Sequence, residues 1–188
     1  MPGCPWCSLL PPYVRAARSV CWATAGSGGQ LVHALKYDGW TRLAPVLATR
    51  MARLAWPDDV VEERTALVPV PLAPLKLRER GFNQSELLAA AVGRNWELDL
   101  WPDALHRVRA TRTQTRLAPD AREANVAGAF VVRMDVVERV RGAHLILVDD
   151  VVTTCATLNE CAAALYDAGA RLISYLTFGR APMAADRI

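Results

Sequence analysis

The segment LILVDDVVTTCAT, residues 145–157, decides the fold of this chain. Leu145, Ile146, Leu147 and Val148 form a continuous apolar run, which is typical of a strand covered on both faces of a parallel sheet. Two acids end this run, and apolar residues then return at helical spacing, at Leu158, Cys161, Ala162 and Leu165. The segment therefore predicts a buried strand leading into a helix, with Asp149 and Asp150 at the strand's carboxyl end.

The turn between this strand and helix has the composition of an anion site. It is built from small and hydroxyl-bearing residues: Val152, Thr153, Thr154, Cys155, Ala156 and Thr157. Free backbone N–H groups and the positive end of the helix dipole favour a phosphate at such a turn. We therefore expect a sugar phosphate, with Asp149 and Asp150 taking its ribose hydroxyls or their magnesium.

An apolar strand ending in two acids also occurs in the magnesium sites of nucleotide hydrolases and in receiver domains. The chain contains no G-x-x-x-x-G-K-[ST] loop, which argues against the hydrolases. Too little sequence follows Asp150 for a receiver domain. The sugar-phosphate interpretation is therefore favoured.

The same residues resemble the phosphoribosyl pyrophosphate (PRPP) motif of type I phosphoribosyltransferases. The shared pattern is four apolar residues, two acids, two apolar residues and TT-x-AT. The chain departs from that family at Cys155, where glycine is usual. A Cβ at this position hinders a left-handed backbone angle or crowds the phosphate.

Size and composition indicate one ordinary globular domain with a small appendage. The chain has 188 residues, of which 52% are hydrophobic and 22% charged, and a formal net charge of +3. No apolar run reaches membrane-spanning length and no signal peptide is visible, so we expect a cytoplasmic protein. Basic residues gather in residues 76–80 and 107–122, either facing an anionic ligand or forming a solvated basic face.

The cysteines supply only half of a structural zinc site. Cys4 and Cys7 form a C-x-x-C, whereas four ligands are needed, and Cys21, Cys155 and Cys161 belong to other segments. Zinc is therefore disfavoured in this chain, and a free or disulfide-forming pair is the favoured alternative.

Alternating strand and helix patterns predict an α/β fold with a mainly parallel sheet flanked by helices. Residues 66–72 look like a short buried strand. The loop that follows, residues 71–81, is then expected at the same carboxyl-terminal edge of the sheet as Asp149 and Asp150. Asn83 or Ser85 can cap the next helix. The residues at this junction that could hold a pyrophosphate are Arg78, Arg80, Asn83 and Gln84. Residues 105–130 suggest a basic lid loop, and residues 130–132 and 172–178 two further strands.

Five ordered segments, LVHALKYDGW, LVPVPL, RERGFNQSELLA, RTQTRLAPDAREANVAGAF and LILVDDVVTTCAT, are similar to the ComF family of bacterial phosphoribosyltransferase-like proteins. The likeness covers nearly the whole chain. It implies a type I phosphoribosyltransferase fold over residues 26–188, preceded in residues 1–25 by the remnant of a zinc ribbon and a first strand. CPWC resembles only the last C-x-x-C of that ribbon, so Cys4 and Cys7 are the expected zinc ligands if zinc binds at all.

The resemblance also implies roles for individual residues. It places Asp149 and Asp150 on the ribose side of PRPP, and Val70, Pro71 and Lys36 at the pyrophosphate. Four residues, Thr113, Gln114, Arg122 and Asn125, match the family's pattern in the segment that forms the flexible catalytic loop in related amidophosphoribosyltransferases. The implied partners are the proteins of DNA uptake during natural competence, including a helicase and a recombination mediator.

Two functions remain open from the sequence. The first is magnesium-dependent phosphoribosyl transfer with pyrophosphate release, in which Asp149, Asp150, Gln114 and Arg122 are the catalytic residues. The second is a non-catalytic accessory protein that binds single-stranded DNA or a protein partner through the basic loop, with Trp96 and Trp101 the nearest aromatics.

Overall fold

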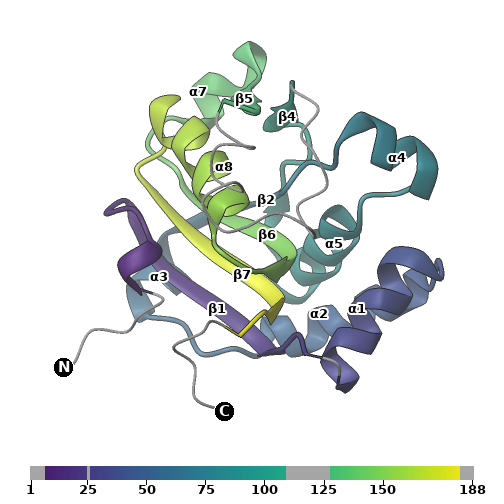
Figure 1. Ribbon diagram of the computed structural model, residues 1–188. Helices are drawn as coiled ribbons and strands as arrows, with labels where there is room; N and C mark the ends of the chain where they lie inside the picture. Colours follow the sequence, from purple (N-terminus) through teal and green to yellow (C-terminus); the bar gives the residue numbers. More distant parts are fainter. Residues whose placement is uncertain (1–6, 25, 109–127, 183–188) are drawn as a thin grey trace.

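The structure, a computed structural model, describes residues 7–24, 26–108 and 128–182. At its centre lies a five-stranded sheet in the order β1-β7-β6-β2-β3, in which all neighbouring strands run parallel (Figure 1). The strands are β1 (Val14–Trp22), β2 (Arg64–Pro69), β3 (Asp99–Leu100), β6 (His144–Val152) and β7 (Leu172–Arg180). The strand that carries the acidic pair, β6, is therefore central, with β7 and β2 beside it.

Strand β6 buries side chains on both of its faces. Leu145 and Leu147 pack into one hydrophobic cluster, whereas Ile146 and Val148 pack into another on the opposite face. Successive side chains of a strand point to opposite faces, so a continuous apolar run is what a doubly covered strand requires. The strand predicted from these four residues is confirmed.

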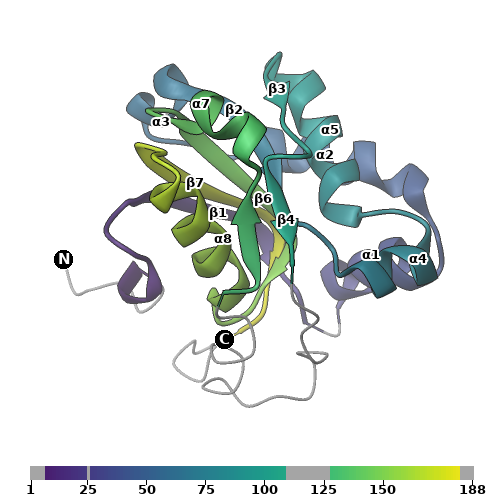
Figure 2. The same ribbon diagram turned by 90° about the horizontal axis from the view of Figure 1, so that it is seen from above.

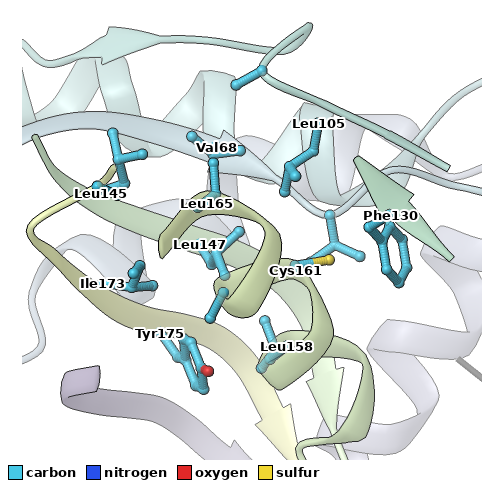
Figure 3. Close-up of a cluster of buried hydrophobic side chains, with 14 of the residues drawn as sticks. Val68, Leu105, Phe130, Leu145, Leu147, Leu158, Cys161, Leu165, Ile173 and Tyr175 are labelled. Carbon is cyan, nitrogen blue, oxygen red and sulfur yellow. The ribbon is translucent and has the colours of Figure 1, made fainter. Parts of the chain in front are cut away.

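Helices cover both faces of the sheet. Helix α8 (Ala156–Asp167) and the short α7 (Val137–Val140) contribute to the first cluster, where Leu158, Cys161 and Leu165 of α8 meet the sheet (Figure 3). Helices α1 (Ser27–Tyr37), α2 (Ala44–Ala52) and α5 (Gln84–Trp96) contribute to the second cluster. The predicted α/β fold with a mainly parallel sheet between helices is confirmed.

A small second sheet lies beside α8. It pairs β4 (Leu105–Arg107) with β5 (Phe130–Val132) in antiparallel fashion, and the two strands flank residues 109–127, which lie outside the described residues (Figure 2). The described residues also contain single turns of 3-10 helix, namely η1 (Cys7–Leu9), η2 (Thr41–Leu43) and η4 (Met134–Val136).

Two segments expected to lack regular structure are helical. The polar composition of residues 58–63 suggests a linker, but these residues form α3 (Asp58–Glu63), which starts after Pro57 with two acids in its first turn. Residues 71–81, interpreted as a loop, contain α4 (Pro74–Arg80). Acids at a helix amino terminus and proline in the first turn both favour helix starts, so these local signals outweigh the polar composition.

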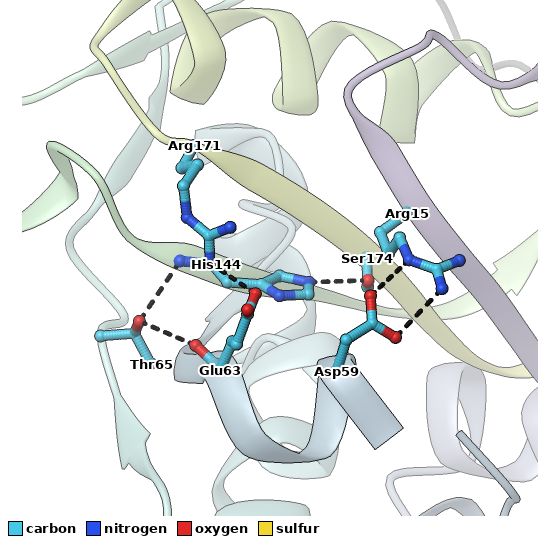
Figure 4. Close-up of polar contacts among 7 residues, drawn as sticks. All are labelled: Arg15, Asp59, Glu63, Thr65, His144, Arg171 and Ser174. Atoms are coloured by element: carbon cyan, nitrogen blue, oxygen red, sulfur yellow. Dashed lines mark hydrogen bonds and ion pairs between the residues drawn. The ribbon is translucent and has the colours of Figure 1, made fainter. Parts of the chain in front are cut away.

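A polar cluster ties α3 to the amino-terminal ends of the strands, at the edge opposite the acidic pair (Figure 4). Arg15 donates to both carboxylate oxygens of Asp59, at 2.5 and 3.0 Å, and Arg171 donates to Glu63 at 2.6 Å. The ring of His144 is buried, and its Nε2 lies 2.9 Å from the Ser174 hydroxyl. Burial, followed by the nearby Arg171 charge, lowers the pKa of His144.

The predicted domain boundary between residues 25 and 26 is not tested by the described residues and stays a prediction. Strand β1, which lies before that boundary, pairs with β7 as an edge strand of the main sheet. Among the helices that the structure describes, none is both long and apolar enough to cross a bilayer.

Candidate functional site

A cavity of about 520 Å³ opens at the carboxyl ends of the central strands. The turn after β6, the loop after β2 and parts of α1, α4 and α5 line it. Most of the site residues predicted from sequence meet here, namely Lys36, Val70, Pro71, Arg80, Gln84, Asp149, Asp150, Val152, Thr153, Cys155, Ala156 and Thr157. Parallel strands bring their carboxyl ends to one edge, which explains why segments distant in sequence converge.

The acidic pair lines this cavity. Asp150 is almost fully buried, and its Oδ1 accepts a hydrogen bond of 3.4 Å from the Gln84 amide. Asp149 Oδ1 accepts a 2.8 Å hydrogen bond from the Ser85 hydroxyl and another of 2.8 Å from the backbone N–H of Asp150. The protein therefore orients both carboxylates before any ligand arrives.

Lys36, in the last turn of α1, forms an ion pair with Asp150 Oδ2. Burial alone would lower the pKa of Lys36, but the Asp150 carboxylate reverses this effect and the pKa is raised. Although burial raises the pKa of Asp150, attraction to the Lys36 ammonium outweighs it, and the pKa is lowered. Burial and repulsion from Asp150 raise the pKa of Asp149 to about 7. The pair therefore holds one secure negative charge, on Asp150.

The start of α5 organises the second wall of the cavity. Asn83 caps this helix, because its side-chain oxygen accepts the Ser85 N–H at 3.1 Å while its amide donates to the Val70 carbonyl at 3.0 Å. Gln84, the next residue, accepts a hydrogen bond from Arg80. Asn83 thus fastens the loop after β2, and the two residues that follow it reach the acidic pair.

The turn after β6 ends at the amino terminus of α8, as an anion site requires. Cys155 is the N-cap of α8, with φ 62° and ψ −6°, in the left-handed region. Cys155 is 4% exposed and belongs to the hydrophobic cluster beneath α8, and burial raises the pKa of its thiol to about 11. The left-handed angle, one of the two reasons considered for the usual glycine at this position, is therefore present, and a cysteine adopts it.

Several predicted site residues lie elsewhere. Arg78 is exposed on α4, and neither it nor Thr154 lines the cavity. Asn83 also lies outside the lining, but it donates a hydrogen bond to the carbonyl of Val70, which lines the cavity. Cys7 is exposed and forms no disulfide with another described cysteine. The remaining predicted residues fall outside the described ranges, namely Cys4, Thr113, Gln114, Arg122 and Asn125.

Sequence reasoning missed four polar residues that line the cavity: Tyr37, Lys76, Ser85 and Arg107. Lys76 and Arg107 lie within the basic stretches noted above, and this charge was the available signal. Ser85 was considered only as a helix cap. Its bond to Asp149 joins positions 64 residues apart, and no local pattern shows such a contact.

The donor set of the acidic pair suits magnesium. Carboxylate oxygens are hard ligands, and magnesium usually binds through one or two of them with ligand phosphates and water. The pair already holds a cation, the Lys36 ammonium, at Asp150. Within the described ranges no group of three histidine, cysteine or acidic side chains is placed to hold a metal by itself. A metal here would therefore depend on ligand oxygens.

Comparison with known proteins identifies relatives over most of the chain. DNA utilization protein YhgH of Escherichia coli K12 is 34% identical over 174 residues, 87% of this chain and 70% of that protein. Its counterpart in Salmonella typhi is 36% identical over 151 residues, 76% of this chain and 63% of that protein. Competence protein F of Haemophilus influenzae is 34% identical over 116 residues, 62% of this chain and 50% of that protein.

No protein-family model matches the chain. Among solved structures, that of TT1426 from Thermus thermophilus is 15% identical with a TM-score of 0.39. The match covers 78% of this chain and 85% of that one.

Proposed function

Since this chain belongs to the ComF-like family that includes YhgH and competence protein F, we propose that it is a phosphoribosyltransferase-type protein that binds PRPP with magnesium. The observation that carries the proposal is the placement of the oriented acidic pair and the amino-terminal turn of α8 in one cavity. The proposed setting is the cytoplasm, in support of DNA uptake.

The charge of the cavity supports a polyanionic ligand. Its described lining includes four basic side chains, Lys36, Lys76, Arg80 and Arg107, against the acidic pair. Anionic ligands gain most where several cations converge on a partly enclosed cavity. A ribose hydroxyl can bond to a carboxylate while a 5′-phosphate takes backbone N–H groups of residues 152–157.

In the proposed reaction the bond from ribose C1 to pyrophosphate breaks and a nitrogen nucleophile attacks C1. Asp149 and Asp150 hold the ribose hydroxyls, and the turn at residues 152–157 holds the 5′-phosphate. Arg80 and Lys36 neutralise charge on the departing pyrophosphate, and Gln114 and Arg122 belong to the loop expected to exclude water. Magnesium, when bound with PRPP, supplies further neutralisation of the pyrophosphate charge.

The proposal is tested by calorimetric titration of PRPP with magnesium into the wild type and Asp150→Asn. The matched control is Asp103→Asn, which makes the same change at an exposed position outside the cavity. We expect binding to be lost in Asp150→Asn and kept in Asp103→Asn. Folded wild-type protein that binds no PRPP would refute the proposal. If binding is observed, pyrophosphate release with ammonia, amines and nucleobases then tests for transfer.

A second candidate is a non-catalytic accessory protein that binds single-stranded DNA, and the exposed aromatics favour it. Tyr37 and Trp40 are 63% and 62% exposed, and Arg80 of the basic helix α4 packs over the Tyr37 ring at 5.5 Å. Basic groups beside exposed rings suit stacked single strands. The tryptophans considered from sequence are both partly buried, since Trp96 donates to the Ala52 carbonyl and Trp101 lies beneath Arg139.

Fluorescence anisotropy with a labelled oligodeoxythymidylate at low salt tests this candidate. We expect salt-sensitive binding that weakens in Trp40→Ala and persists in Trp101→Phe, which retains an aromatic ring at a partly buried position. Equal affinity for the wild type and Trp40→Ala would exclude this surface as the binding site.

A further inference from the structure

Lys36 reaches from α1 to the most buried acid of the cavity. Its ammonium pairs with Asp150 Oδ2, and the two side chains are 23% and 4% exposed. Helix α1 buries only Val32 and Leu35 among its 11 residues. The ion pair thus joins a lightly anchored helix to the central strand across the site.

Both oxygens of Asp150 are engaged by the protein. The Gln84 amide donates to Oδ1, and the Lys36 ammonium takes Oδ2. Asp149 Oδ1 is likewise held, by Ser85 and by the Asp150 N–H. A buried carboxylate needs a counter-charge, because its removal from water costs much more than any single hydrogen bond returns. Lys36 supplies that counter-charge in the protein without ligand.

We propose that Lys36 is a built-in counter-ion that keeps a free divalent cation off the acidic pair, so that the metal enters only together with a phosphorylated ligand. This inference rests on the proposed function, since it concerns the same cavity. An ammonium on Oδ2 blocks that oxygen and repels a dication at the neighbouring oxygens. A dication that displaced Lys36 from Asp150 would leave the lysine ammonium without its counter-charge.

A phosphorylated ligand removes this obstacle because it brings its own anions. Lys36 and Arg80 line the same cavity, so a phosphate bound there can accept a hydrogen bond from the Lys36 ammonium. The lysine side chain carries its charge on a flexible four-carbon stem, so the ammonium can move from Asp150 to a phosphate without moving α1. Lys36 is thus a positioning residue that couples metal entry to ligand entry.

The test measures binding of Mn²⁺, used alone as a probe, by the electron paramagnetic resonance signal of the free ion. The proteins are the wild type, Lys36→Met, Lys36→Met with Asp150→Asn, and Lys76→Met. Lys76 is the matched control because it lines the same cavity but pairs with Glu79 at 2.8 Å. We expect Lys36→Met to bind Mn²⁺ about tenfold more tightly than the wild type. The gain should be absent from Lys76→Met and lost in the double variant.

Three results would overturn the inference. The first is wild-type protein that binds PRPP and yet binds Mn²⁺ as tightly alone as with PRPP, a comparison that needs no variant. The second is an equal gain in Lys36→Met and Lys76→Met, which would show a general effect of charge. The third is no gain in a folded Lys36→Met, or in Lys36→Gln should the methionine variant not fold. The variant titrations contain no PRPP, so failure of PRPP binding would refute the proposed function and leave their result standing.

Discussion

Replacing Cys155 by glycine tests whether the turn before α8 carries backbone strain. Cys155 has φ 62° and is 4% exposed, whereas the next residue, Ala156, is buried without a positive φ. The informative comparison is Cys155→Gly against Cys155→Ala, because both lack the sulfur and differ only in the Cβ. Ala156→Gly removes the same methyl group from ordinary backbone and is the matched control.

The expected free energies follow from three effects. Glycine in place of alanine loses about 0.8 kcal/mol of methyl burial and about 0.5–1 kcal/mol of backbone entropy. At a left-handed angle glycine also recovers about 1–2 kcal/mol of steric strain. These effects nearly cancel at position 155, so the two variants should differ by less than about 0.8 kcal/mol in either direction. At Ala156 nothing offsets the loss, and glycine should cost about 1.3–1.8 kcal/mol.

Urea unfolding of all four proteins measures these differences. The first difference is the stability of Cys155→Ala minus that of Cys155→Gly, and the second is the stability of the wild type minus that of Ala156→Gly. If the two differences are equal, the proposed backbone strain at Cys155 is refuted. In that case the left-handed angle would impose no cost on a side chain. PRPP titration of the same proteins then asks whether removing the Cβ tightens phosphate binding, as expected if the Cβ crowds the turn.

Three further predictions concern single side chains. Ser85→Ala removes a hydroxyl donor from Asp149 and should weaken PRPP binding while lowering stability by about 1–2 kcal/mol. Calorimetry and urea unfolding measure these two effects, and the control Ser27→Ala, at an exposed position, should change neither PRPP binding nor stability. Asp149→Asn should abolish PRPP binding yet raise stability at pH 8 by up to about 4 kcal/mol, because the pKa of Asp149 rises from 3.8 to about 7 on folding. The wild type therefore loses stability as pH rises between these values, and a stability difference between variant and wild type that is the same at pH 5 and pH 8 would contradict this prediction. His144→Gln should flatten the fall in stability as pH drops below the ordinary histidine pKa of about 6.5, because burial lowers the pKa of His144 and the unfolded chain then binds the proton more readily. Parallel curves of stability against pH for variant and wild type between pH 7.5 and pH 5 would count against this prediction.

The sequence determined the central strand, the acidic pair at its end and the helix that follows. Residues 145–148 are apolar without interruption because both sheet faces are covered, and such a run is visible in any single window of sequence. Asn83 or Ser85 was predicted as the cap of α5, and a left-handed angle at Cys155 was one of two reasons considered for the usual glycine, because both features depend on residues close in the chain. The helices α3 and α4 were missed, since local start signals there compete with polar composition.

Only the tertiary structure decided which side chains meet in the cavity. Lys36 was expected at a pyrophosphate, but its partner in the ligand-free protein is Asp150, 114 positions further along the chain. Ser85 reaches Asp149 because the start of α5 lies beside the carboxyl end of β6, and Arg78 is exposed while Arg80 lines the cavity. Local sequence sets backbone preferences within a few residues. Contacts between distant segments follow from strand order and helix packing, which no short window contains.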